Sequence, residues 1–190
     1  IAQAHRRLGC EVTVIDAFTI LGNQDPEFAE IILEQLVNEG INLKSETKVN
    51  GVAQSGNAIS VEVEVDGKVA TISGTHLLVA TGRAPNVNGL DLENTDIQFD
   101  KRGVKVDQSL RSDAKRVYAI GDVAQIKGAP FNPQFTHVAN YHAGLVIRSI
   151  LFRMPTKVTY DYLPWVTYTD PELAHVGLTE AQAKQIHQQK

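Results

Sequence analysis

The sequence predicts an α/β protein with a parallel sheet, because helices and apolar strands alternate along its first part. A helix-forming segment at 1–8 precedes a β-branched strand at 11–15, and an amphipathic helix follows Asp25. The helix followed at once by this strand is typical of the second half of a strand–helix–strand unit, whose two strands lie parallel. A continuous apolar run at 76–81 fits the same fold, since strands covered on both faces lack polar alternation.

The two helices of this part have recognisable ends. Residues 1–8 have no N-cap and run to Gly9, where a left-handed C-terminal cap belongs, so this helix is expected to begin before the first residue. We therefore expect the chain to be a piece of a longer protein. Asp25 supplies an N-cap for the second helix, and Pro26 is its first residue. Apolar residues then recur at helical spacing as far as Gly40, namely Phe28, Ile31, Ile32 and Leu36.

A different pattern over 59–73 predicts an antiparallel hairpin. Apolar and polar residues alternate over 59–65, and the turn Asp66-Gly67 separates this strand from a second one at 68–73. Such alternation is typical of a strand with one exposed face.

The second part of the chain is less regular. A polar, turn-rich stretch at 86–112 contains a hairpin turn at 101–103, and 116–120 predicts a buried strand. A helix is expected over 136–152 and is ended by Pro155. Its apolar side is expected to contain Ala139, Ala143, Val146, Ile147 and Ile150.

The last stretch contains a strand at 165–168 and a Thr-Asp-Pro turn. Thr179 and Gln182 then form the pattern of a capping box, which predicts the start of another helix.

Composition narrows the class of protein. Of 190 residues, 43% are hydrophobic and 21% charged, which is typical of a soluble globular protein and not of a disordered one. A net charge of −4 with scattered basic residues argues against a nucleic-acid partner. No apolar run approaches the roughly 20 residues of a membrane span. The single cysteine, Cys10, excludes an internal disulfide and a thiolate metal cage, and we expect it to be a buried structural thiol.

Two aspartates end predicted strands. Asp16 lies where a dinucleotide-binding fold places a carboxylate for the adenosine ribose, although a strand-end aspartate also occurs in ordinary turns. Asp122 follows a predicted strand and a glycine, so its carboxylate could accept from a ribityl or ribose hydroxyl, or could cap a helix or turn. Each residue alone leaves both interpretations open.

The helix that begins at Thr136 offers free amides and a positive dipole end to a flavin ring or a phosphate, as every helix start does. The short distance from Gly121-Asp122 adds weight to this interpretation. His137 and His142 are five residues apart and point to different helix faces. Structural or stacking roles are therefore expected for them, and no metal site is assigned.

Five segments, in their order along the chain, resemble the class I pyridine nucleotide-disulfide oxidoreductases, the family of dihydrolipoamide dehydrogenase, mercuric reductase and glutathione reductase. The resemblance covers essentially the whole chain. Its most specific part is the pair Ala-Thr-Gly-Arg83 and Ala-Ile-Gly-Asp122, at their separation in the sequence. Two of the segments are closer to mercuric reductase-like members than to glutathione reductase. The five are Val-Thr-Val-Ile-Asp16, Leu-Leu-Val-Ala-Thr-Gly-Arg-Ala-Pro-Asn86, Val-Tyr-Ala-Ile-Gly-Asp-Val123, Pro-Gln-Phe-Thr-His-Val-Ala139 and Val-Thr-Tyr-Thr-Asp-Pro-Glu-Leu-Ala174.

The resemblance implies three domain pieces within the α/β fold. Residues 1–81 are similar to a Rossmann-like NAD domain without its first strand and glycine loop. Residues 82–157 are similar to the returning part of an FAD domain of the three-layer β/β/α type. Residues 158–190 are similar to the start of an α+β interface domain, through which we expect a homodimer to form.

The resemblance also implies cofactor contacts. Asp16 corresponds to the acidic residue on the adenosine ribose of NAD, Val49 to an adenine contact, and Gly82 to a contact on the nicotinamide side. Asp122 corresponds to the carboxylate on the flavin ribityl chain. The segment that approaches the flavin ring at the helix start contains Gln134, Phe135, Thr136 and His137.

The implied activity is hydride transfer from NADH to FAD and on to a disulfide or metal acceptor, in the cytoplasm. The family's redox cysteine pair, flavin glycine motif and His-Glu base pair have no counterparts in this sequence, so no catalytic residue is assigned and the acceptor stays open. A flavin-linked NADH oxidase, a ferredoxin-type reductase and a non-catalytic nucleotide-binding module remain as alternatives.

Overall fold

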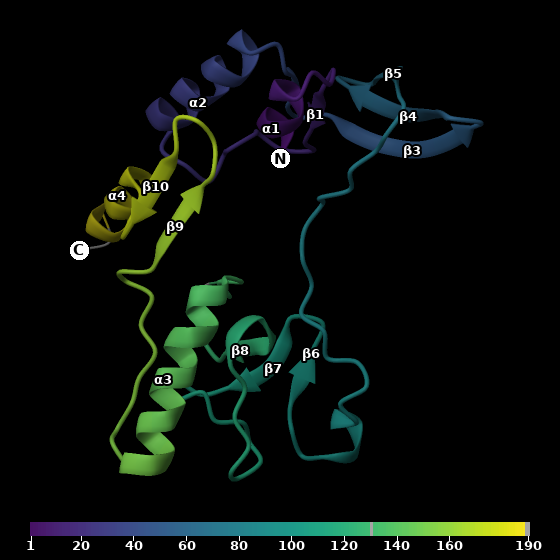
Figure 1. The fold of residues 1–190 in the computed structure, drawn as a ribbon. Coiled ribbons are helices and arrows are strands. Elements are labelled where there is room, and N and C mark those ends of the chain that lie inside the picture. Colours follow the sequence, from purple (N-terminus) through teal and green to yellow (C-terminus); the bar gives the residue numbers. More distant parts are fainter. Residues whose placement is uncertain (130, 189–190) are drawn as a thin grey trace. The chain divides into compact units, whose positions relative to one another are not determined.

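The computed structural model describes residues 1–129 and 131–188 (Figure 1). The chain divides into two compact units. The first unit consists of Ile1–Val79 together with the chain from Asp161 onward, and the second unit is Ala80–Tyr160. The assignment of 1–81, 82–157 and 158–190 to cofactor and interface domains stays a prediction.

The first unit opens with a parallel pair of strands, of which the second was not predicted. Helix α1 (Ala2–Arg7) leads to strand β1 (Thr13–Ile15), and helix α2 (Pro26–Asn38) leads to strand β2 (Asn42–Lys44), which pairs parallel with β1. The buried core of this pair contains Ile32, Leu36 and Ile41. Gly9 adopts φ +95, as its predicted capping position requires. The predicted α/β class is thus confirmed.

A three-stranded antiparallel sheet follows, with order β3-β4-β5. The hairpin β4 (Ala58–Val65) and β5 (Lys68–Gly74) is the predicted one, and Val61 and Val63 are buried on its inner face. Strand β3 (Lys48–Ser55) was not predicted. Every residue of β3 is exposed, so its sequence lacks the apolar alternation by which β4 could be recognised.

The chain returns to the first unit with a hairpin and a helix. Strands β9 (Pro164–Thr167) and β10 (Leu173–Val176) pair antiparallel, and helix α4 (Glu180–Gln188) follows. The predicted capping box is present, because Gln182 N donates to Thr179 Oγ1 at 3.3 Å and Thr179 N donates to Gln182 Oε1 at 3.1 Å. Asp25 is the N-cap of α2, yet its carboxylate accepts from Glu180 N at 2.9 Å and makes no side-chain bond to α2.

The second unit packs a small mixed sheet against one long helix. After the 3₁₀ turn η1 (Leu92–Asn94), strand β6 (Phe99–Asp100) pairs antiparallel with β7 (Gly103–Val106), which pairs parallel with β8 (Ala124–Ile126). A second 3₁₀ turn, η2 (Gly121–Val123), precedes β8, and helix α3 (Thr136–Phe152) has the predicted bounds. Their shared core includes Val106, Leu110, Ala124 and Leu145.

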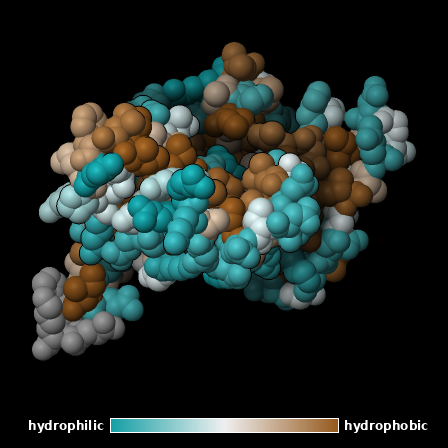
Figure 2. All heavy atoms as spheres, turned by 90° about the horizontal axis from the view of Figure 1, so that it is seen from below, coloured by the Kyte–Doolittle hydropathy of each residue, from teal (hydrophilic) through white to brown (hydrophobic). Residues whose placement is uncertain are grey.

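Two predicted buried strands are absent. Residues 76–81 form no strand, and Leu78 and Val79 are 64% and 69% exposed. At 116–120 the only β contact is an isolated bridge between Tyr118 and Arg111, and Val117 and Ile120 are exposed. An apolar run becomes a buried strand only where neighbouring strands satisfy its backbone, and no described residue pairs with 76–81. Figure 2 shows, for the face that it presents, apolar side chains exposed among polar ones.

The apolar side of α3 is only partly buried, and the predicted burial of Cys10 was wrong. On α3 the buried residues are Val138, His142 and Leu145, whereas Ile147 and Ile150 are 51% and 52% exposed. Val146 of the predicted apolar side packs against the core, and the fully buried face beside it contains a histidine whose ring nitrogens have partners. Cys10 is exposed, since it lies in the uncovered turn between α1 and β1.

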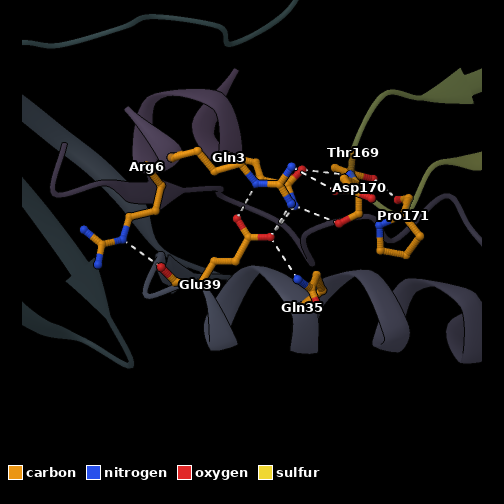
Figure 3. Close-up of polar contacts among 8 residues, drawn as sticks. Gln3, Arg6, Gln35, Glu39, Thr169, Asp170 and Pro171 are labelled. Carbon is orange, nitrogen blue, oxygen red and sulfur yellow. Dashed lines mark hydrogen bonds and ion pairs between the residues drawn. The ribbon is translucent and has the colours of Figure 1, made fainter. Parts of the chain in front are cut away.

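A network of polar contacts joins α1, α2 and the loop after β9 within the first unit (Figure 3). Glu39, at the end of α2, accepts two bonds from the Arg7 guanidinium at 2.9 and 2.6 Å and one each from Gln3 and Gln35, both at 2.9 Å. Gln3 also donates to Asp170 O at 2.8 Å and accepts from Asp170 N at 2.8 Å. These bonds, first among them those from Arg7, lower the pKa of Glu39 from 4.5 to about 2.

One close contact holds η2 against α3 in the second unit. Gly121 has φ +68, and a Cβ added to it would lie 2.9 Å from Ala139 Cβ. Real Cβ atoms do not approach so closely, so only glycine allows the backbone of η2 to reach α3 at this point. The glycine before Asp122 therefore serves helix packing.

We expect Glu39→Gln to lower the free energy of unfolding at neutral pH and to flatten its loss in acid. With the pKa of Glu39 near 2 in the folded chain and 4.5 otherwise, its ionised form stabilises the fold above pH 4.5, and this contribution is lost as the pH falls toward 2. Urea unfolding between pH 7 and 2 measures the effect. Glu34→Gln, on the exposed side of the same helix, is the control; equal pH profiles for both variants would contradict the assignment.

We expect Gly121→Ala to destabilise the chain by about 2–4 kcal/mol, because it adds a left-handed backbone penalty to a steric overlap with Ala139. Gly128→Ala is the matched control, since Gly128 has φ +81 but no atom within 4 Å of an added Cβ. It should cost only the backbone penalty of about 1–2 kcal/mol. Denaturant unfolding of the three proteins measures the difference, and a loss at Gly121 no larger than at Gly128 would refute the packing role.

Candidate functional site

In the first unit, Asp16 lies at the end of β1 in a fixed position. Its backbone N donates to Lys44 O at 2.9 Å, and its carbonyl accepts from Thr47 N at 2.8 Å. Its side-chain Oδ1 accepts from Phe18 N at 2.9 Å, which closes a tight turn. One oxygen of the carboxylate thus has the turn role, while Oδ2 has no hydrogen-bond partner in the described part of the chain. The two interpretations of Asp16 are compatible.

The surface around Asp16 is hollowed. The residues that line this open hollow all belong to the loop between β1 and α2: they are Asp16, Phe18, Thr19, Leu21, Gly22, Asn23 and Gln24. Phe18 is 79% exposed beside the carboxylate. Val49, on β3, is also exposed and follows Thr47 by two residues, so the bond between Thr47 and Asp16 ties the start of β3 to this region. A flat ring beside a carboxylate can accommodate a nucleoside.

In the second unit, Asp122 is half-buried within η2. Its backbone carbonyl accepts from Asn132 Nδ2 at 3.3 Å. Across residues 1–129 and 131–188, no hydrogen bond or ion pair engages its carboxylate. An aspartate that is partly removed from water and still has free acceptor atoms can accept a hydrogen bond from a ligand hydroxyl.

The start of α3 is tied to the loop that contains Gly82. Arg83 Nη1 donates to Gln134 O at 2.7 Å. Gly82 has φ +129 and no atom near its Cβ position, so its backbone is open to a ligand. Phe135 is the N-cap residue, and its ring stacks on that of His137 with centroids 5.2 Å apart and planes at 13°. Thr136 is the first helical residue, so the amides of the first turn of α3 lie here.

In the second unit, the buried His142 on α3 is bonded to the turn η2 and to Tyr160. Gly121 N donates to His142 Nδ1 at 3.1 Å, and His142 Nε2 lies 3.0 Å from Tyr160 Oη. Burial lowers the pKa of His142. Burial, followed by the charge of Tyr141, raises the pKa of Tyr160 to about 12. Both side chains are therefore neutral at physiological pH.

The structure thus divides the predicted contacts into two sets. Asp16 and Val49 lie in the first unit. The second unit contains the others, namely Gly82, Asp122, Gln134, Phe135, Thr136 and His137. The bond from Arg83 to Gln134 O links the Gly82 loop to the start of α3, and the bond from Asn132 to Asp122 O links Asp122 to the loop before α3.

Sequence reasoning missed several supporting residues. Arg83, next to Gly82, could have been noticed as a cation within a singled-out segment. Asn132 and Tyr160 carry no local signal, and the role of His142 depends on partners 18 and 21 residues away.

Residues 1–129 and 131–188 contain no group of three or more His, Cys, Asp and Glu side chains able to hold a metal ion. In the same residues, no helix is long and apolar enough to cross a bilayer.

Known proteins have sequences similar to this one. Mercuric reductase from Staphylococcus aureus is 37% identical over 187 residues, which cover 97% of this chain and 33% of that protein. Mitochondrial dihydrolipoyl dehydrogenase from Caenorhabditis elegans is 36% identical over 185 residues, which cover 95% of this chain and 36% of that protein. The chain thus spans about a third of the length of these curated relatives.

Solved structures share the fold. The Cu(II) complex of the HOCl-induced flavoprotein disulfide reductase RclA from Escherichia coli matches with a TM-score of 0.84 at 26% identity, over 97% of this chain and 41% of that chain. LpdA from Mycobacterium tuberculosis matches with a TM-score of 0.84 at 25% identity, over 97% of this chain and 39% of that chain.

The family resemblance found in the five sequence segments is confirmed. The sequence model of the pyridine nucleotide-disulphide oxidoreductases matches residues 1–143, which is well over half of the chain. Relatives in this family are FAD-containing, NAD(P)H-dependent enzymes. The chain therefore belongs to the pyridine nucleotide-disulphide oxidoreductase family.

Proposed function

We propose that the whole protein is a flavoprotein oxidoreductase that moves reducing equivalents from NADH through FAD to a disulfide or metal acceptor. The observation that carries the proposal is the half-buried Asp122 carboxylate, which no side chain or amide of the described residues engages and which lies on a turn packed against α3. Family membership and the relatives named mercuric reductase and dihydrolipoyl dehydrogenase support it.

We assign residues 1–81 to an NAD domain, 82–157 to an FAD domain and 158–190 to the start of an interface domain. Asp16 and Val49 would hold the adenosine half of NAD, with the free Oδ2 of Asp16 accepting from a ribose hydroxyl. Gly82 would lie against the nicotinamide half. We further propose a homodimer formed through the interface domain, and a location in the cytoplasm.

The second unit fits a flavin by the chemistry of its donors and acceptors. Asp122 would accept from a ribityl hydroxyl, while the positive dipole end of α3 at Thr136 would face electron-rich atoms of the ring. Arg83 holds Gln134 in place by its bond to the carbonyl. A bound flavin supplies the chemistry that links a two-electron hydride donor to the acceptor.

We expect Asp122→Ala to weaken flavin retention most among single substitutions of these contacts. It removes a charge-assisted acceptor from a partly buried hydroxyl, which costs about 1.5–3 kcal/mol, or roughly ten- to a hundredfold in affinity. Asp122→Asn should cost less, because an amide oxygen still accepts. Flavin content of the whole protein after extensive dialysis measures the effect. Asp16→Ala is the matched control and should keep its flavin; the reverse outcome would mean that the two carboxylates serve the opposite cofactors.

We expect NADH to be preferred over NADPH by at least about tenfold in kcat/KM, because Asp16 repels a 2′-phosphate. The two arginines of α1 are engaged elsewhere. Arg6 donates to Glu39 O and Cys10 O, and Arg7 is paired with Glu39 and Asp170. Asp16→Ala should raise the KM for NADH and narrow the preference. Steady-state kinetics of the whole protein with both cofactors measures this, and a clear preference for NADPH would overturn it.

A further inference from the structure

His142 is the one histidine that the structure removes fully from solvent among the described side chains. It lies in the middle of α3 with 0% exposure. Both ring nitrogens have partners, Gly121 N on η2 and Tyr160 Oη beyond the end of α3. The ring therefore bridges the helix to the turn that contains Asp122.

The partners determine which nitrogen of His142 carries the proton. A backbone N–H can only donate, so Nδ1, which receives the Gly121 N–H, must be unprotonated. The proton of the neutral ring is then on Nε2 and is donated to Tyr160 Oη, 3.0 Å away. The ring satisfies a buried backbone donor that would otherwise be unpaired.

The same ring thereby fixes the backbone immediately before Asp122. Gly121 is held from two sides, by its bond to Nδ1 and by its close approach to Ala139. Asp122 follows it directly, and its carbonyl is held by Asn132. We propose that His142 is a positioning residue for the flavin, and that only its neutral ring holds the Asp122 carboxylate where a flavin hydroxyl can reach it. This inference rests on the proposed flavin site at Asp122.

Protonation of His142 would break this arrangement. A proton added at Nδ1 turns the acceptor of Gly121 N–H into a second donor, so the bond is lost and a charge is buried. Besides His142, the ionisable side chains on the elements that hold the ring are His137, Tyr141 and Arg148 on α3, Asp122 on η2, and Tyr160. Of these, Tyr141 and Tyr160 have their rings beside that of His142. The Tyr160 phenol is neutral, and burial is the cause that lowers the pKa of His142 below its ordinary value of 6.5. The positioned state is thus complete above pH 6.5 and is lost as the pH falls through the lowered pKa of His142.

The test compares three forms of the flavin-loaded whole protein from about pH 7.5 to 5.5: wild type, His142→Asn and His142→Leu. In His142→Asn the amide Oδ1 is bonded to Cγ, as Nδ1 is in histidine, so an acceptor is kept for Gly121 N–H. The amide does not titrate. Leu fills the space and offers no acceptor. FAD dissociation constants are measured by the fluorescence of released flavin, and far-UV circular dichroism checks that each protein stays folded. His137 is retained throughout, so its own contribution is common to all three.

We expect wild-type affinity for FAD to fall about fivefold between pH 7.5 and 5.5, and that of His142→Asn to change less than about twofold. His142→Leu should bind about tenfold more weakly at every pH, because Gly121 N–H is left unpaired. If His142→Leu does not fold, the first comparison decides alone. Equal pH dependence of wild type and His142→Asn would overturn the inference.

Asp122→Ala, measured alongside, separates this inference from the proposed function. If Asp122→Ala binds FAD as tightly as wild type, the flavin site itself is misplaced. If it loses FAD while His142→Asn keeps the wild-type pH profile, the site stands and the role of His142 is refuted.

Discussion

The contact between Gly121 and α3 is the constraint on which the second unit depends. It has a steric part, which excludes any Cβ at position 121, and a polar part, the bond from Gly121 N to His142 Nδ1. Together they fix the position of η2 against α3, and β8 begins directly after η2. Asp122 is thus presented by backbone geometry, with its carboxylate left unengaged within the described residues.

The parts of the fold that could be predicted are those whose signals are short in sequence. The bounds of α3, the turn at Asp66-Gly67 and the capping box at Thr179 each depend on residues a few positions apart, and all three were found. The apolar runs at 76–81 and 116–120 carry the same local signal as true strands. What they lack is a partner strand among the described residues, and no local pattern reports on that.

The candidate site divides in the same way. Asp16 was predictable because it ends a strand, and its turn bond to Phe18 does not exclude a ligand on the other oxygen. The buried face of α3 was not predictable, because a histidine counts against burial in any apolar pattern. His142 is buried only because Gly121 and Tyr160 satisfy its ring, and these partners lie outside the helix.

The two units use opposite electrostatic solutions to hold their elements together. In the first unit, Arg7 and Glu39 are both ionised, near solvent, and each strengthens the charge of the other. In the second unit, His142 and Tyr160 are neutral, and burial opposes any charge on either. Acid therefore acts on the two by different routes. Burial opposes protonation of His142, so its bond to Gly121 N is kept until the pH falls through a pKa that lies below the ordinary histidine value of 6.5. Hydrogen bonds oppose protonation of Glu39, and the stability that its ionised form contributes is lost as the pH falls from 4.5 toward 2.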